Sequence, residues 1–193
     1  MKSEPQCSIN FSTKKDIRKN MLSRRNLMNS NEVREYSDEI FENFCDLNFD
    51  FQSVMIYLSF KNEVMTERFI SQFKIAKKDV SIPYCIDDSS MDAVKLVDFD
   101  EFKVNKYDIL EPENPVKINK NTIELCIIPG VAFDGFGARI GFGKGYYDRF
   151  LKGTNIIKIG LCYDFQIMKS PLPSDINDIK MDYIISEKRI IKL

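Results

Sequence analysis

The sequence predicts an α/β fold: a single three-layer domain in which a mainly parallel or mixed sheet is flanked by helices, in a Rossmann-like arrangement. Two observations support this. Short apolar runs alternate with segments of helical periodicity along the 193 residues, and strands that alternate with helices usually pair in parallel around one core. All eight glycines lie between Gly130 and Gly160, so one region of this domain has unusual backbone requirements.

The N-terminal part of the chain is expected to hold a tail and two helices. Residues 1–11 resemble a flexible tail, and the domain is expected to span 12–193. Thr13 and Asp16 have the spacing of a capping box, which predicts a helix start. The apolar positions of this first helix are Ile17, Met21 and Met28. A second helix starts at Ser30, and its apolar positions fit a 3.6-residue period: Val33, Tyr36, Ile40, Phe41 and Phe44.

The middle of the chain predicts three strands and one short helix. Residues 53–59 form a compact apolar run, which is typical of a buried strand. Thr66 is a candidate cap for a helix that carries Phe69, Ile70 and Phe73. Residues 79–83 form a strand that ends at a proline, and residues 93–99 form a third strand. Residues 100–122 are polar and show no clear element, so we expect a long surface excursion.

The C-terminal part continues the alternation. Strands are expected at residues 123–128, 155–163 and 181–186, with a helix at residues 145–152 and a proline-containing loop at residues 164–177. Ligands of parallel sheets bind at the carboxyl ends of the strands. Glu63 and the glycine-rich residues 129–148, here called the glycine segment, both follow strands. The two regions are therefore expected to meet at one cleft.

Composition excludes several kinds of chemistry. The chain has no histidine, which removes Ser-His-Asp triads, Cys-His pairs and imidazole metal ligands. Lys plus Arg is 28 and Asp plus Glu is 29, a net charge of −1, so no overall field favours nucleic acid or membrane. No apolar run approaches the ~20 residues of a membrane span. Five cysteines without a C-x-x-C pair favour a reducing, cytoplasmic location over a zinc site or disulfides.

The glycine segment suits phosphate binding but matches neither common nucleotide motif. A Walker A loop would need glycine where Ala138 stands and Ser or Thr where Gly145 stands. The alternating glycines still allow backbone amides to reach phosphate oxygens, and Arg139 and Lys144 supply positive charge. Asp148 is a candidate Mg²⁺ ligand. The alternatives are a purely structural cluster of turns and an ordinary carboxylate in the first turn of a helix.

Several motifs together resemble one family. Those in the glycine segment are Pro129-Gly-Val-Ala-Phe-Asp134 and Gly137-x-Arg139-Ile-Gly-Phe-Gly-Lys-Gly-Tyr-Tyr-Asp148. Shorter pieces occur in the same order as in the family: Lys14-x-x-x-Arg18, Tyr57-Leu-Ser-Phe-Lys-Asn-Glu63, Lys78-x-Val-x-Ile-Pro83, Glu111-Pro112, Tyr163-x-x-Gln166 and Asn177-Asp178. The whole resembles the 5-formyltetrahydrofolate cyclo-ligase family, also called methenyltetrahydrofolate synthetase. Ile140 stands where the family signature usually has Leu.

The resemblance implies an ATP-dependent cyclisation of 5-formyltetrahydrofolate to 5,10-methenyltetrahydrofolate, with release of ADP and phosphate. It implies ATP contacts at Lys14, Arg18, Arg139, Ile140, Gly141, Phe142, Gly143, Lys144, Gly145, Tyr146 and Tyr147. It implies folate contacts at Leu58, Glu63, Phe142, Gly143, Lys144, Gly145 and Tyr146, with Phe142 and Tyr163 as candidate pocket aromatics. Asp148 and Asp178 would hold Mg²⁺, and Lys144, Arg139 and Tyr147 would be catalytic.

The implied reaction needs no protein nucleophile. Transfer of the γ-phosphoryl group onto the formyl oxygen would make an iminophosphate-like species, the N10 amine of the substrate would attack, and phosphate would depart. The protein must align the groups and neutralise charge, which agrees with a chain without histidine. We expect a cytoplasmic monomer that acts on 5-formyltetrahydrofolate, with or without a polyglutamate tail, and binds neither nucleic acid nor membrane. The alternatives are a non-catalytic folate- or nucleotide-binding protein, and nucleic-acid binding through Lys14-Lys15 and Arg24-Arg25.

Overall fold

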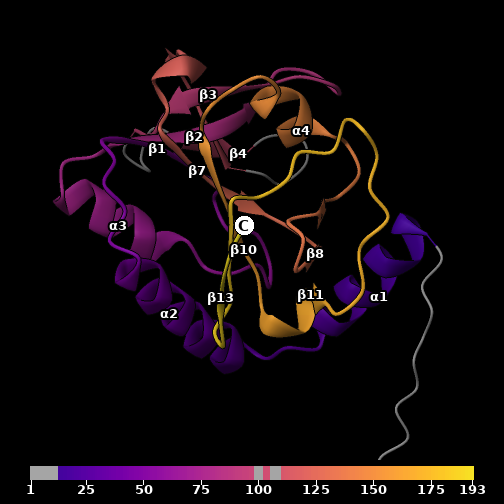
Figure 1. Cartoon of the computed structure of the whole chain (residues 1–193). Helices are drawn as coiled ribbons and strands as arrows, with labels where there is room; N and C mark the ends of the chain where they lie inside the picture. Colours follow the sequence, from indigo (N-terminus) through magenta and orange to yellow (C-terminus); the bar gives the residue numbers. More distant parts are fainter. Residues whose placement is uncertain (1–12, 98–101, 105–109) are drawn as a thin grey trace, which may run out of the picture.

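The computed structural model describes residues 13–97, 102–104 and 110–193, and an eight-stranded sheet forms its centre (Figure 1). The order is β13-β12-β10-β7-β1-β2-β3-β6. The strands are β1 (Ser53–Ile56), β2 (Asp79–Cys85), β3 (Met91–Lys95), β6 (Lys117–Ile118), β7 (Leu125–Pro129), β10 (Ile157–Leu161), β12 (Tyr183–Ile185) and β13 (Ile190–Lys192). The neighbouring strands from β12 to β2 in this order pair in parallel. At the two edges, β13 pairs antiparallel with β12, β3 with β2, and β6 with β3. The predicted mainly parallel or mixed sheet is confirmed.

Helices cover both faces of this sheet. They are α1 (Lys14–Asn26), α2 (Ser30–Asp46), α3 (Glu67–Ile75) and α4 (Tyr146–Leu151). Because alternate residues of a strand point to opposite faces, Val54 and Ile56 of β1 enter the core under α2 and α3. Met55 between them enters a second core, which α4 covers. The result is the predicted three-layer α/β architecture.

The first half of the glycine segment folds as a hairpin and not as a loop. Its strands are β8 (Ala132–Asp134) and β9 (Arg139–Ile140), which form a small sheet with β11 (Ile167–Met168). Asp134 is buried, and its carboxylate accepts hydrogen bonds from the N–H groups of Phe136, Ala138 and Leu172. Helix α1 packs on this sheet through a separate apolar cluster. The hairpin therefore seats the N-terminal helix beside the glycines.

Two predicted caps behave differently. The hydroxyl of Thr13 accepts the backbone N–H of Asp16 at 3.2 Å, so the predicted start of α1 is confirmed. Thr66 stands at the start of α3 but makes no side-chain cap. Its buried hydroxyl instead donates to the carbonyl of Tyr57 and accepts the N–H of Ser59. This threonine fastens the chain that follows β1 to the start of α3.

The predicted end of a strand at Pro83 is wrong, because β2 continues to Cys85. Pairing of β2 with β1 ends at Ser81, and beyond that residue β3 is its partner among the described strands. Proline is tolerated where a strand lacks a neighbour on one side, since its missing N–H then breaks no ladder. Strand β3 begins at Met91 and ends at Lys95, where a strand over residues 93–99 was expected; 98 and 99 lie outside the described residues.

Short elements account for the other differences. The region predicted as an excursion contains β4 (Phe102–Val104), β5 (Leu110–Pro112), β6 and a 3₁₀ turn at Lys120–Thr122. The loop at 164–177 contains β11 and a 3₁₀ turn at Asp164–Gln166. Strand β13 was not predicted, and Met28 lies beyond the end of α1. The predicted tail at 1–11 lies outside the described residues. Within the described part of the chain, no helix is long and apolar enough to cross a membrane.

Candidate active site

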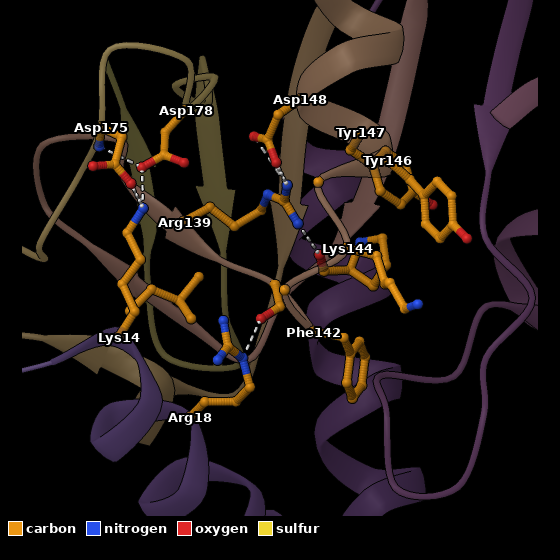
Figure 2. Close-up of a pocket in the computed structure, with 15 residues that line it drawn as sticks. Lys14, Arg18, Arg139, Phe142, Lys144, Tyr146, Tyr147, Asp148, Asp175 and Asp178 are labelled. Atoms are coloured by element: carbon orange, nitrogen blue, oxygen red, sulfur yellow. Dashed lines mark hydrogen bonds and ion pairs between the residues drawn. The ribbon is translucent and has the colours of Figure 1, made fainter. Parts of the chain in front are cut away.

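A pocket of about 370 Å³ opens where the glycine segment meets α1, beside the carboxyl end of β7 (Figure 2). Its lining residues are Lys14, Arg18, Pro129, Arg139, Ile140, Gly141, Phe142, Gly143, Lys144, Gly145, Tyr146, Tyr147, Asp148, Asp175 and Asp178. The structure thus brings together every residue that the sequence predicted for nucleotide and metal. Leu58 and Glu63, predicted for folate, are not among the described residues that line it.

The glycines serve two different purposes. Gly143 and Gly145 have φ of +100° and +66°, a left-handed backbone that other residues rarely adopt, so they shape the pocket wall. Gly130 and Gly160 instead make room for the buried ring of Phe133. A Cβ atom at these two positions would lie 2.2 and 2.4 Å from that ring. The segment is therefore only partly a ligand loop, and packing explains part of its glycine content.

Arg139 is the fixed positive charge of the pocket. Its side chain is 6% exposed, and its guanidinium donates to the Pro129 carbonyl at 3.2 Å and to the Asp148 carboxylate at 3.2 Å. The ring of Tyr147 lies 5.5 Å away. The Nε atom is buried and has no hydrogen-bond partner among the described residues. Buried donors are normally paired, and a guanidinium that lines a pocket with one N–H unpaired is suited to an anionic ligand.

Lys14 closes one side of the pocket as part of an ionic clasp (Figure 2). Its amine contacts Asp175 at 2.6 Å and Asp178 at 2.5 Å. Burial alone would lower the pKa of Lys14, but hydrogen bonds to both carboxylates leave it raised. Burial alone would raise the pKa of Asp178, but hydrogen bonds from Lys14 and from the Asp175 N–H leave it lowered. Lys14 and Asp178 are therefore both charged at neutral pH. Asp175 was not predicted from the sequence.

Arg18 joins α1 to the glycine segment, since its Nε donates to the Gly141 carbonyl at 2.8 Å. The predicted shared face of Lys14 and Arg18 is confirmed, because both line the pocket. Asp148 accepts from Arg139 and from the backbone N–H of Ile179. The described residues contain no group of three or more His, Cys, Asp or Glu that could hold a metal. The two candidate ligands, Asp148 and Asp178, both line the pocket. This number of carboxylates suits Mg²⁺, which commonly takes one or two carboxylates together with phosphate oxygens.

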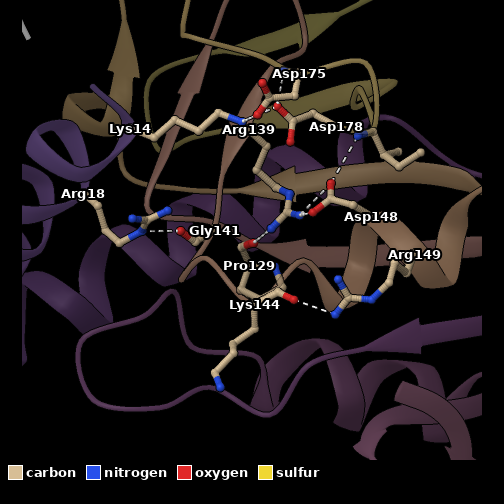
Figure 3. A network of polar contacts seen from close by, with 11 residues as sticks. Lys14, Arg18, Pro129, Arg139, Gly141, Lys144, Asp148, Arg149, Asp175 and Asp178 are labelled. Atoms are coloured by element: carbon tan, nitrogen blue, oxygen red, sulfur yellow. Dashed lines mark hydrogen bonds and ion pairs between the residues drawn. The ribbon is translucent and has the colours of Figure 1, made fainter. Parts of the chain in front are cut away.

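Lys144 differs from the other predicted cations. Its amine lies 3.5 Å from Asp88, and the two side chains are 60% and 93% exposed. Figure 3 shows it directed away from Arg139 and Asp148. The Lys144 carbonyl accepts a hydrogen bond from Arg149, whose Nε also donates to Ser89. The turn after β2 therefore contacts the rim of the pocket, a contact that the sequence did not indicate.

Tyr147 is half-buried, and burial raises the pKa of its phenol well above 10. The phenol therefore stays protonated at neutral pH and is suited to donate a hydrogen bond but not to act as a base. Tyr146 lies on the rim, where its hydroxyl donates to the Asp87 carbonyl at 2.9 Å. The two adjacent tyrosines thus have different surroundings, which periodicity could not separate.

Glu63 is buried next to Arg25. Its side chain is 8% exposed, accepts the Phe60 N–H at 3.1 Å and lies 3.8 Å from the Arg25 guanidinium. Burial raises the pKa of Glu63, while Arg25 and the Phe60 N–H oppose this. The Arg25 guanidinium also lies 5.7 Å from the ring of Phe142. Arg25 therefore connects the two regions that were predicted to meet. The sequence indicated Arg25 only as part of the Arg24-Arg25 pair in the nucleic-acid alternative, and not as a partner of Glu63.

The two candidate folate aromatics are placed differently. The Phe142 ring is more than half exposed at the pocket. Tyr163 is fully buried in the core, where its hydroxyl donates to the Glu63 carbonyl at 3.1 Å. In this structure Tyr163 supports the Glu63 loop from behind and does not line the pocket, so its prediction as a ligand-facing aromatic is wrong.

Comparisons with known proteins point to one family. The model of the 5-formyltetrahydrofolate cyclo-ligase family matches residues 10–187. A cyclo-ligase of Mycoplasma genitalium is 32% identical over 89% of this chain and 96% of its own length. A probable cyclo-ligase of Schizosaccharomyces pombe is 31% identical over 73% of this chain and 78% of its own.

Solved structures give the same answer. The NMR structure of Aquifex aeolicus 5,10-methenyltetrahydrofolate synthetase superposes with a TM-score of 0.81 at 30% identity, and covers 93% of this chain and 92% of that one. The synthetase of Mycoplasma pneumoniae gives a TM-score of 0.75 at 26% identity, with 90% and 98% covered. The fold, the glycine segment and these relatives lead to one conclusion. This chain belongs to the 5-formyltetrahydrofolate cyclo-ligase family.

Proposed function

We propose that the pocket between α1 and the glycine segment binds ATP, which this protein uses to close a ring in its folate substrate. As a member of its family, the protein is a 5-formyltetrahydrofolate cyclo-ligase, which forms 5,10-methenyltetrahydrofolate. The observation that carries the assignment of the pocket is the buried Arg139, whose Nε lacks a partner among the described residues. Lys14 and Arg18 line the same pocket and add positive charge. Such a group of cations favours a polyphosphate.

ATP supplies the phosphoryl group that turns the formyl oxygen into a leaving group. The residues of this chain act on charge and position. Arg139 is held by Pro129 and Asp148, so it needs no rearrangement to face an anion. Gly143 and Gly145 adopt a left-handed backbone without strain, and the absence of a Cβ atom there leaves room beside the Arg18 and Arg149 side chains. Tyr147, protonated at neutral pH, would donate a hydrogen bond to the ligand, and Lys144 would supply a further cation after leaving Asp88.

Asp148 and Asp178 would hold Mg²⁺, which neutralises phosphate charge when it is bound. Each carboxylate is now occupied by a protein cation, Arg139 for the first and Lys14 for the second. Binding of a metal would therefore release Lys14 toward the nucleotide. On the folate side, the proposed contacts of the substrate are Leu58, Glu63, Phe142, Gly143, Lys144, Gly145 and Tyr146. The N10 amine of the substrate is the nucleophile, so the chain has only to orient it.

We also propose that the enzyme is a cytoplasmic monomer that accepts folates with or without a polyglutamate tail and binds neither nucleic acid nor membrane. The unpaired cysteines of the described chain, Cys45, Cys85, Cys126 and Cys162, fit a reducing compartment. Size-exclusion chromatography with light scattering tests the monomer. A dimer at micromolar concentration would overturn that part of the proposal.

The catalytic proposal is tested with purified protein, 5-formyltetrahydrofolate, ATP and Mg²⁺. We expect the near-ultraviolet absorbance of the methenyl product to rise, with one ADP formed per product. Omission of ATP or addition of a chelator should stop the reaction. Folded protein that binds folate without turnover would contradict the proposal and favour a sequestering protein.

A further inference from the structure

Arg25 is a buried arginine whose charge is incompletely paired. Its residue is 5% exposed, and its Nε has no hydrogen-bond partner among the described residues. The carboxylate of Glu63 lies 3.8 Å from its terminal nitrogen, which is an ion pair but too long for a hydrogen bond. Burying a charge is costly unless the charge is well paired. Such a loose pair is poor support for stability, so a role in function is the better explanation.

Arg25 also occupies a connecting position. It stands seven residues, about two helical turns, after Arg18, so both side chains leave α1 on the same side. Arg18 reaches the nucleotide pocket, whereas Arg25 reaches Glu63 and lies 5.7 Å from the Phe142 ring. Asn62, next to Glu63, donates its amide to the carbonyls of Arg25 and Met28 at 3.0 and 2.9 Å. The end of α1 and the Glu63 loop are thereby fastened together.

We propose that Arg25 is a positioning residue for the folate substrate: it holds Glu63 as an oriented carboxylate and holds the Phe142 ring beside it. The inference rests on the proposed function, in which Glu63 and Phe142 contact folate. A buried carboxylate is a strong acceptor for ligand N–H groups, and folate carries such donors on its ring system. Because α1 also carries Lys14 and Arg18, one rigid helix would set the geometry of both substrates.

The groups around Glu63 explain why Arg25 is needed. Tyr57, which follows β1, Tyr147 of α4 and Tyr163 lie close enough to interact electrostatically with it, and burial raises the pKa of each, to about 12 for Tyr163. These phenols are therefore neutral. The Phe60 N–H donates from the loop itself. Among the described groups that act on Glu63, Arg25 supplies the positive charge. Removal of Arg25 would raise the pKa of Glu63 further. As the pH falls, the Glu63 carboxylate would then become protonated at a higher pH than in the wild type.

The test compares Arg25→Met and Arg25→Lys with Arg24→Met as the matched control. Arg24 is exposed and stacks on Phe165 at 4.6 Å, outside the pocket. We expect R25M to raise the KM for 5-formyltetrahydrofolate about tenfold or more, the scale of a lost charged partner. The KM for ATP should change by less than about twofold, well below the tenfold change that corresponds to about 1.4 kcal/mol of binding free energy. R25K should recover part of the loss, and R24M should resemble wild type.

The pH profile separates positioning from a merely structural role. In R25M the acid limb of kcat/KM for folate should move to higher pH, by about one unit or more. In Glu63→Gln that limb should disappear, and adding R25M to this variant should cost little more. Equal rises in both KM values, or an acid limb that does not move, would overturn the inference. If R25M does not fold, R25K and E63Q still test the inference. An unchanged KM for folate in R25K, together with an acid limb of kcat/KM that persists in E63Q, refutes the role of Arg25. Wild-type protein without turnover refutes the proposed function instead.

Discussion

The two proposed halves of the site, one for the nucleotide and one for the folate, hold their charges in opposite ways. In the nucleotide half, Lys14 is partly exposed and is clasped by two aspartates at 2.5 and 2.6 Å. In the folate half, Arg25 and Glu63 are almost fully buried and 3.8 Å apart. Exposed ion pairs exchange partners at little cost, whereas buried charges are costly to rearrange. The difference indicates a nucleotide half that is remodelled by its ligand and a folate half that is formed in advance.

The largest effect is expected at Arg139, the buried exception in the nucleotide half. Arg139→Met should lower kcat/KM by roughly 10²–10³-fold, as for loss of a fixed charge-stabilising donor. It should also lower the free energy of unfolding by about 3 kcal/mol, because Asp148 loses its partner. Steady-state kinetics and chemical denaturation measure the two. Arg34→Met, on the exposed face of α2, is the control. Wild-type activity in R139M would exclude Arg139 as the anion-binding residue of the pocket.

Lys144 tests whether an exposed cation joins the nucleotide on binding. Lys144→Ala should raise the KM for ATP about tenfold, the scale of one charge-assisted hydrogen bond. The free energy of unfolding should stay within about 0.5 kcal/mol of wild type, since the side chain is largely exposed. Asp88→Asn removes its present partner and should leave the KM unchanged or lower. Unchanged ATP kinetics in K144A would exclude this lysine from the site.

The glycines provide a comparison within one segment. Gly143→Ala forces a side chain into a left-handed backbone and crowds Arg18, so the KM for ATP should rise several-fold at a cost of roughly 1–2 kcal/mol in stability. Gly130→Ala collides with Phe133, so stability should fall by about 1–3 kcal/mol while the KM for ATP is unchanged. Thermal melts and ATP kinetics read the two effects. The reverse pattern would contradict the division of the glycines into packing and pocket residues.

Asp175 is expected to give the smallest effect. Asp175→Asn removes one competitor for Lys14 while Asp178 keeps the other contact, so the KM for ATP should fall by about twofold at most. A tenfold rise would instead place Asp175 among the nucleotide ligands.

The clasp also predicts a pH dependence of stability. The folded pKa of Asp178 is lowered, so its contribution is present above the unfolded value of about 3.9 and is lost as the pH falls through the folded pKa. Asp178→Asn should therefore be less stable than wild type by a constant amount from about pH 5 to 8 and should approach wild type in acid. Denaturation curves at each pH provide the measurement, and a constant difference at every pH would contradict the linkage.

Local pattern predicted much of this molecule. The apolar runs of β1, β7, β10 and β12 indicated the parallel sheet, and one contiguous motif contained most of the pocket lining. Strands of two or three residues, such as β9 and β11, are too short to show a period. Asp175 pairs with Lys14 across 161 positions, and Arg25 meets Glu63 only after the chain folds. Such partners depend on tertiary packing, which no local pattern encodes.

The most direct test of the division of the site is calorimetry of each substrate alone, with wild type, Arg139→Met and Glu63→Gln. ATP binding is measured with Mg²⁺, and folate binding without nucleotide. We predict that R139M loses ATP binding and keeps folate binding, and that E63Q does the reverse. If either folded variant loses both ligands equally, the two halves are not separate sites.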